Sequence, residues 1–160
     1  MTTAGPDAPA SVPASVPASV PASVPADPDY DRFARLVCAQ LGVPTALVSF
    51  VTPHAQLMPG AVGLPGDHQR TRVAPRRASV CQVVVAREAP LVLPDARGHA
   101  LLADVDVDVD LLDVVAYAGA PLRDARGAVV GSLCALDDRP RDWTDADVAV
   151  LLDLAAICSS

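Results

Sequence analysis

Proline recurs at every fourth position between residues 9 and 25, within a repeated Val-Pro-Ala-Ser unit. Each proline lacks a backbone N–H and clashes with the preceding turn of a helix, so this spacing excludes both a helix and a central strand. We therefore expect residues 1–28 to form an extended, disordered tail. Seven of the 16 prolines precede residue 29, which leaves residues 29–160 to fold as one domain.

The composition excludes two classes of partner. The chain has a formal net charge of −7, it contains no Lys, and only 3% of its residues are aromatic. A nucleic-acid-binding surface needs positive charge and aromatic stacking platforms, so we expect no nucleic-acid partner. The apolar runs are shorter than a membrane-spanning helix, and residues 1–28 lack the basic residues of a secretory signal. We therefore expect a cytoplasmic protein that does not enter the membrane.

The cysteines and histidines lack the spacing of a metal site. No two cysteines form a Cys-x-x-Cys pair, and the three histidines stand far apart. In a cytosolic protein the thiols are expected to be reduced. We therefore expect neither a metal nor a cofactor. The four cysteines are Cys38, Cys81, Cys134 and Cys158.

Residues 104–110 carry an aspartate at every second position. The pattern invites a calcium site, but Val109 and Val115 stand where an EF-hand loop needs Gly and Glu. Four like charges on one side of a strand would also repel each other. We therefore expect an exposed, flexible acidic loop.

Local signals predict a helix and a hairpin at the start of the folded region. Asp27-Pro28-Asp29 is typical of a helix start, and Gly42 is typical of its end. Residues 45–51 are expected to form a strand and residues 54–58 its return. Residues 59–75 contain three Gly and three Pro, which indicates a mobile loop.

The middle of the chain alternates between short helices and strands. Ser79 and Gln82 match a capping box, which favours a helix over residues 79–88. Further elements are expected as a strand at 91–93, a short helix at 98–103, and strands at 113–120 and 128–136 joined by a turn at 124–127. This order of helices and hairpins indicates an α+β domain with an antiparallel sheet.

The last helix is apolar on two sides. Thr144 is its expected N-cap, and Trp143 with Val148 forms a hydrophobic staple. One side should cover the sheet and the other should contact a partner. The helix reaches Ser160 without a Gly or Pro stop, so we expect it to be truncated here. The first side consists of Val148, Leu151, Leu152 and Ala155, and the second side consists of Val150, Leu154 and Ile157.

Several strings stand in a characteristic order along residues 29–158: Leu-Val-Leu-Pro-Asp-Ala at 91–96, Ala-Tyr-Ala-Gly-Ala-Pro-Leu at 116–122, Gly-Ser-Leu-Cys-Ala-Leu at 131–136 and Arg-Pro-Arg-Asp-Trp-Thr at 139–144. With the opening helix and Ser79-Val80-Cys81, they resemble a GAF domain. The resemblance is closest to bacterial GAF domains that precede histidine kinases, diguanylate cyclases or PP2C-type (SpoIIE-like) phosphatases. It implies a GAF-like α+β fold, with an antiparallel sheet of five to six strands flanked by helices.

The resemblance implies a cytoplasmic sensory domain without catalysis of its own. Such a domain binds a small molecule or senses a redox signal, and passes it through its terminal helices to a kinase, phosphatase or cyclase output domain. It also implies a homodimer formed through the first and last helices. The expected ligand-binding residues are Phe50, Met58, Cys81, Asp95, Tyr117, Pro121 and Cys134. Tyr117 and Asp95 are the expected polar anchors, although a satisfied core hydroxyl and a loop-capping carboxylate are alternatives.

Two other functions remain open. Free methionine-(R)-sulfoxide reductase is a GAF enzyme of similar length, and Cys81 falls near one of its reactive cysteines. However, no cysteine stands between Pro94 and Val114, where the catalytic thiol would be expected, and no further thiol is expected near Cys81. The other alternative is a purely structural dimerisation module with a pocket filled by side chains. Redox sensing at Cys81 would need an electropositive setting, which Arg76, Arg77 and the helix start could supply.

Overall fold

The computed structural model describes residues 20–103 and 114–160, so the acidic repeat at 104–110 lies outside the described residues. It contains a six-stranded antiparallel sheet with the strand order β3-β2-β1-β6-β5-β4, which confirms the α+β prediction. The elements are α1 (Pro28–Leu41), β1 (Thr45–Val51), β2 (Ala55–Val62), α2 (His68–Thr71), β3 (Val73–Pro75), η1 (Arg76–Ala78), α3 (Cys81–Arg87), β4 (Leu91–Leu93), η2 (Ala100–Leu102), β5 (Ala116–Arg123), β6 (Val129–Asp137) and α4 (Asp145–Ser159).

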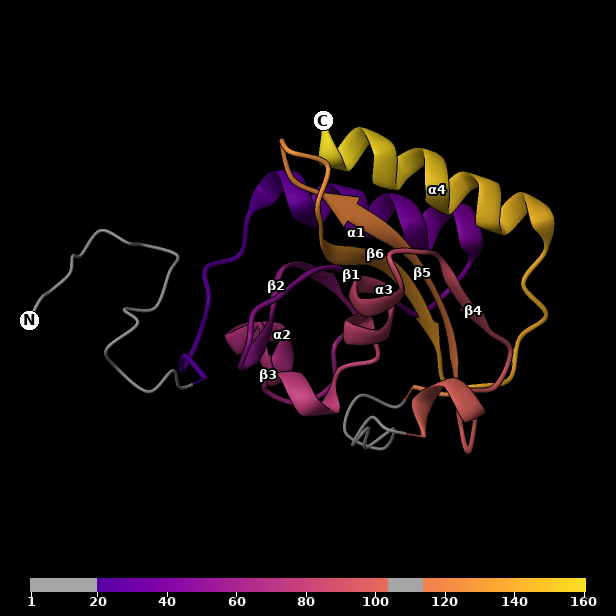
Figure 1. The fold of residues 1–160 in the computed structure, drawn as a ribbon, viewed down its shortest axis with the longest axis horizontal. Coiled ribbons are helices and arrows are strands. Elements are labelled where there is room, and N and C mark those ends of the chain that lie inside the picture. Colours follow the sequence, from indigo (N-terminus) through magenta and orange to yellow (C-terminus); the bar gives the residue numbers. More distant parts are fainter. Residues whose placement is uncertain (1–19, 104–113) are drawn as a thin grey trace, which may run out of the picture.

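The sheet separates two helical layers. Helices α1 and α4 lie side by side on one face, while α3 covers the other (Figure 1). The two long helices run antiparallel, because Arg141, just before α4, donates to the carbonyl of Leu41 at the end of α1. Each layer buries its own apolar cluster against the sheet, so the two faces can be considered separately.

The ends of the long helices follow the sequence prediction. Asp27 accepts from the backbone N–H groups of the first turn of α1, and Gly42 ends that helix in the left-handed conformation. At α4, Thr144 and Asp147 form a reciprocal capping box, and the carboxylates of the first turn complement the helix dipole. These signals act within one turn, which is why the sequence alone locates them.

The expected loop over residues 59–75 is wrong. Strand β2 continues through Pro59 and Gly60 to Val62, and α2 and β3 follow it. Pro59 lies beyond the part of β2 that pairs with β3 and at the register shift of the β1–β2 pairing, a position where a missing N–H is tolerated. Gly60 is needed where α1 crosses the strand, because a Cβ there would lie 2.5 Å from the carbonyl oxygen of Tyr30. Both residues serve packing, although in sequence they resemble loop signals.

The expected capping box at Ser79 is also wrong. The 3-10 turn η1 ends at Ala78, and α3 begins three residues later at Cys81, with Val80 in the N-cap position. The side chain of Gln82 donates to the carbonyl groups of Arg76 and Ser79 and does not accept from the Ser79 N–H as a capping box requires. That N–H instead donates to the carbonyl of Arg76 and closes η1.

The described end of the proline repeat is attached to the domain. Residues 20–27 form neither helix nor strand, as the proline spacing predicts. However, the N–H of Val24 donates to the carbonyl of Thr71, and the N–H of Asp27 donates to that of Pro59. These residues therefore lie along β2 and α2, and the disorder expected up to residue 28 does not extend to this segment.

Candidate functional site

The two faces of the sheet differ because neighbouring residues on a strand point to opposite sides. On β6, Leu133 and Ala135 join the α1–α4 cluster, whereas Cys134 and Leu136 join the α3 cluster. On β5, Tyr117 faces α3. Most of the predicted site residues lie on the side of the sheet under α3.

Polar groups converge on Cys81 in the middle of the α3 cluster. Its Sγ lies 3.8 Å from the Sγ of Cys134. The hydroxyl of Tyr117 donates to the Cys81 sulfur at 3.2 Å, and the amide of Gln56 donates to it at 3.5 Å. The Tyr117 hydroxyl also lies 3.1 Å from the hydroxyl oxygen of Ser132. Strand pairing between β1, β5 and β6 and the start of α3 thus bring together residues that are far apart in sequence.

This network makes the two thiols unequal. The hydrogen bond with Cys134 and those with the hydroxyls of Ser49, Tyr117 and Ser132 lower the pKa of Cys81 to about 7, against the opposing effect of burial. Burial raises the pKa of the Cys134 thiol, and its proximity to Cys81 raises it further. Burial likewise raises the pKa of Tyr117, which therefore remains a hydroxyl donor. Of the two thiols, Cys81 is the one whose sulfur accepts hydrogen bonds from Tyr117 and Gln56.

Gly119 makes room for the Tyr117 hydroxyl. A Cβ at Gly119 would lie 2.5 Å from that hydroxyl oxygen and 2.7 Å from the Ser132 hydroxyl oxygen. Gly119 is paired with Cys134 across the β5–β6 ladder. The absence of a side chain therefore allows the ring of Tyr117 to reach both Ser132 and Cys81.

Four of the seven predicted site residues meet in this cluster. They are all fully buried, with exposed fractions of 1% or less, and they come from β2, α3, β5 and β6. These residues are Met58, Cys81, Tyr117 and Cys134. Pro121 is the cross-strand partner of Ser132, which places it on the same face of β5 as Tyr117. The expectation that no second thiol lies near Cys81 is wrong, because β6 brings Cys134 into contact with it.

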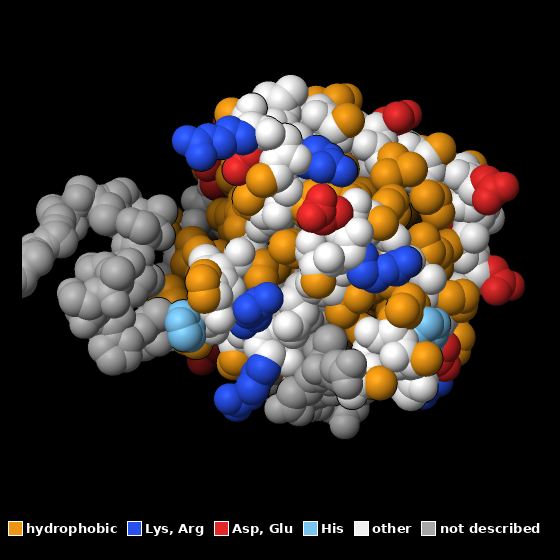
Figure 2. All heavy atoms as spheres, in the orientation of Figure 1, with side chains coloured by type: hydrophobic (Ala, Val, Ile, Leu, Met, Phe, Trp, Pro, Cys, Tyr) orange, Lys and Arg blue, Asp and Glu red, His pale blue; other side chains and the backbone are white. Residues whose placement is uncertain are grey.

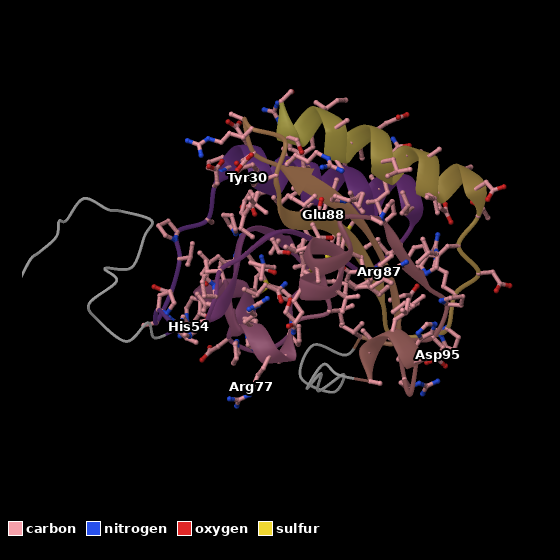
Figure 3. All side chains as sticks on the ribbon, viewed as in Figure 1. Tyr30, His54, Arg77, Arg87, Glu88 and Asp95 are labelled. Atoms are coloured by element: carbon pink, nitrogen blue, oxygen red, sulfur yellow. The ribbon has the colours of Figure 1, made fainter. Side chains whose placement is uncertain are left out.

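The other two predicted residues lie elsewhere. Phe50 projects from β1 into the α1–α4 cluster, where its ring centroid lies 5.5 Å from that of Tyr30. Asp95 is at the rim of the molecule (Figure 3), with 38% of its side chain exposed and an ion pair to Arg97 at 2.8 Å. Its hydrogen bonds with Arg97 lower the pKa of Asp95 to about 2. Asp95 therefore caps its own loop and does not reach the buried cluster.

Three polar residues of the cluster escaped the sequence analysis: Ser49, Gln56 and Ser132. Each is fully buried on a strand. Each also stands two residues from a member of the cluster, as Gln56 does from Met58 and Ser132 does from Cys134. A small or amide side chain at an inward position of an apolar strand was the signal that could have identified them.

One open cleft on the described surface lies away from these residues. A cleft of about 460 Å³ is bordered by the β1–β2 turn, η1 and the end of the proline repeat, and includes His54, Arg76 and Gln82. On the face seen in Figure 2, charged side chains are scattered among hydrophobic ones. Residues 20–103 and 114–160 contain no cluster of three or more His, Cys, Asp or Glu side chains that could hold a metal ion. Within the same ranges, no helix is long and apolar enough to cross a membrane.

Comparison with curated proteins finds a relative of known activity. A cyclic di-GMP phosphodiesterase of Pseudomonas aeruginosa is 31% identical over 115 residues, which is 71% of this chain. The chain spans only 19% of the length of that enzyme. The likeness thus concerns one segment of a much longer protein.

Solved structures share the fold at low identity. The GAF domain of an Acinetobacter phosphoenolpyruvate-protein phosphotransferase superposes with a TM-score of 0.66 at 19% identity, over 86% of this chain and 81% of that one. Free methionine-R-sulfoxide reductase from Neisseria meningitidis gives 0.64 at 17% identity, over 82% of this chain and 74% of the enzyme. The family model for the GAF domain matches residues 28–160. Together with the six-stranded sheet and its two helical layers, this match shows that the chain belongs to the GAF domain family.

Proposed function

We propose that this chain is a cytoplasmic regulatory domain that receives a small-molecule or redox signal on the α3 side of the sheet and transmits it through α1 and α4. The observation that supports this most is the alternation on β6. Leu133 and Cys134 are both fully buried but belong to opposite clusters. A change that moves Cys134 therefore also moves the surface on which Leu151 of α4 packs.

The output in this proposal lies outside the chain. The GAF family resemblance suggests a kinase, phosphatase or cyclase, and the Pseudomonas relative adds a cyclic di-GMP phosphodiesterase. The domain itself regulates and does not catalyse. Its small-molecule input is tested by native mass spectrometry of protein purified without added ligand. A defined adduct that is lost on denaturation supports the proposal, and a bare chain contradicts the small-molecule input.

The proposal includes a homodimer formed through α1 and α4. Three large hydrophobic side chains are exposed on these helices: Leu36, Leu152 and Ile157, the last at 58%. Light scattering of Ile157→Asp should report loss of the dimer, because a carboxylate would be desolvated in the interface. Leu101→Asp is the matched control, since Leu101 is 43% exposed on η2. A monomer in the unmodified chain, or a dimer in both variants, contradicts this interface.

A second candidate function is favoured by the thiol pair. Cys134 lies 3.8 Å from Cys81, so a sulfenic acid at Cys81 would have a resolving thiol beside it. That arrangement is compatible with a methionine sulfoxide reductase, whose fold this chain shares. A thioredoxin-coupled assay on free methionine-(R)-sulfoxide separates the two functions. Turnover that disappears in Cys81→Ser would establish an enzyme, whereas its absence in the reduced chain favours the regulatory domain.

A further inference from the structure

We propose that Cys81 and Cys134 form a reversible dithiol–disulfide centre, oxidised by hydrogen peroxide and confined to the buried side of the sheet. The inference relies on the proposed regulatory function only for the use of the signal. The chemistry stands on the geometry of the two thiols. It gives the redox input a defined site and a defined oxidant class.

The two thiols lie close enough to react with each other. The two sulfur atoms are 3.8 Å apart, which is van der Waals contact, and a disulfide requires about 2.05 Å. Cys81 is the first residue of the seven-residue helix α3, whereas Cys134 is held in the centre of the β1–β6–β5 ladder. The bond would therefore draw the start of α3 toward a fixed strand. The other two thiols, Cys38 and Cys158, pack on the opposite side of the sheet.

The Cys81 sulfur is the acceptor of the hydrogen bonds that surround it. A buried sulfur that serves only packing needs no donors, yet the Tyr117 hydroxyl and the Gln56 amide both point their hydrogens at the Cys81 sulfur. Donors arranged around a sulfur stabilise its thiolate, the form that reacts. Cys81 is thus assigned as the attacking thiol and Cys134 as the resolving thiol.

The reaction balances in two steps. The Cys81 thiolate attacks one peroxide oxygen, so that an S–O bond forms, the O–O bond breaks, and the leaving hydroxide takes a proton to become water. The Cys134 sulfur then attacks the sulfenic sulfur. An S–S bond forms, the S–O bond breaks, and the Cys134 proton leaves with the hydroxyl group as a second water. Two thiols are oxidised and one peroxide is reduced, and a dithiol reductant reverses the change.

Burial selects the oxidant. Cys81 is 1% exposed and Cys134 is not exposed at all, so only a molecule of peroxide size can reach them without unfolding the domain. Glutathione disulfide is too large to enter this cluster. We therefore expect peroxide to form the intramolecular disulfide and glutathione disulfide to leave Cys81 unmodified.

The test uses the reduced full chain, treated with hydrogen peroxide and then denatured, alkylated and mapped by mass spectrometry. The expected product is a Cys81–Cys134 disulfide that dithiothreitol reverses, with Cys38 and Cys158 still open to alkylation. Cys134→Ser should accumulate a dimedone-reactive sulfenic acid at Cys81, because the resolving thiol is gone. Cys38→Ser is the matched control and should form the disulfide like the unmodified chain. Equal oxidation of all four cysteines, bonds between copies, or thiols that stay reduced would overturn the proposal.

Tyr117→Phe tests the positioning of the thiolate separately from its packing. Loss of the hydroxyl donor should move the pH profile of oxidation upward and slow the reaction at neutral pH, because a smaller fraction of Cys81 is then thiolate. An unchanged pH profile would show that Tyr117 only fills space and would overturn the assigned role. Failure of the disulfide with a ligand adduct still present would remove this inference and leave the regulatory proposal intact. A disulfide that forms in a chain that stays monomeric would support this inference and contradict the proposed α1–α4 dimer.

Discussion

The two faces of the sheet differ in the polar groups that they bury completely. The fully buried side chains of the α1–α4 cluster are Ala, Val and Leu, its Tyr30, Cys38 and Cys158 are only partly buried, and ion pairs of Asp31 and Asp147 lie at its rim. The α3 side buries two thiols, a phenol, two serine hydroxyls and an amide among its apolar residues. Polar atoms in a core cost free energy unless they are paired, so their concentration on one face indicates a role beyond stability.

The helices differ in the same way. α1 and α4 have fourteen and fifteen residues and side-chain caps at their N-termini. α3 has seven residues, no side-chain cap, and a C-cap at Glu88 in the left-handed conformation that a non-glycine residue rarely adopts. By these local features α1 and α4 are the better stabilised helices, and α3 is the less stabilised one.

The largest expected loss of stability follows from removing an apolar side chain between α4 and the sheet. Leu151→Ala should lower the free energy of unfolding by about 3 kcal/mol, because Leu151 is 1% exposed and its loss leaves a cavity against the sheet. Leu152→Ala is the control, since the neighbouring residue is 40% exposed and should cost less than about 1 kcal/mol. Urea unfolding of both variants measures the difference. Equal losses would show that α4 is buried on both sides in solution.

The next effect tests the crowding on the α3 side. Gly119→Ala should cost about 2 kcal/mol, because the new methyl group displaces the Tyr117 and Ser132 hydroxyls. Combining it with Tyr117→Phe removes the nearest of those atoms. The double variant should therefore lose less stability than the sum of the single variants, as measured by a double-mutant cycle. If the two losses of stability are strictly additive, the cost of Gly119→Ala arises from the backbone and not from contact with the Tyr117 hydroxyl.

The sequence predicted the fold best where the signals are local. The Asp27 and Thr144 caps, the Gly127 turn and the β1 strand all depend on neighbours within a few residues. The errors arose where the conformation of a residue depends on a partner that is distant in the sequence. Pro59 and Gly60 resemble a loop, but they lie in a strand because α1 crosses there. The composition of residues 59–75 does not indicate that a helix crosses the strand there.

The site was predicted in part for the same reason. Cys81 and Cys134 were recognised one by one, but their contact depends on a pairing across 53 residues. Phe50 was assigned to the site although its position on β1 places it in phase with Val48, which faces α1 and α4. Alternation on a strand tells which residues share a face, but it does not tell which helix covers that face.

A smaller effect separates packing from polarity on the α3 side. Tyr117→Phe should cost about 1 kcal/mol, since it removes one hydroxyl from a paired, buried network and keeps the ring. It should also raise the pKa of Cys81, because the variant lacks one of the hydrogen bonds that lower it. Thiolate absorbance against pH measures this shift in the Cys134→Ser background. Ser132→Ala is the comparison, as it alters the network without removing the Tyr117 donor to Cys81.

The smallest effect concerns the rim of the α1–α4 side, where Asp31 of α1 pairs with Arg72 at 2.8 Å. Burial opposes the shift, but the hydrogen bonds from Arg72 and the Ala61 N–H lower the pKa of Asp31 below its ordinary value of 3.8. The folded state therefore binds this proton less readily than the unfolded state. The pair's contribution is complete above pH 3.8 and is lost as the pH falls through the lower, folded pKa.

Asp31→Asn should thus be less stable than the unmodified chain at neutral pH and approach it in acid, as measured by urea unfolding across that range. A constant difference at every pH would show that the charge of Asp31 does not contribute to stability, because the Asn side chain keeps an oxygen that can accept from the Ala61 N–H.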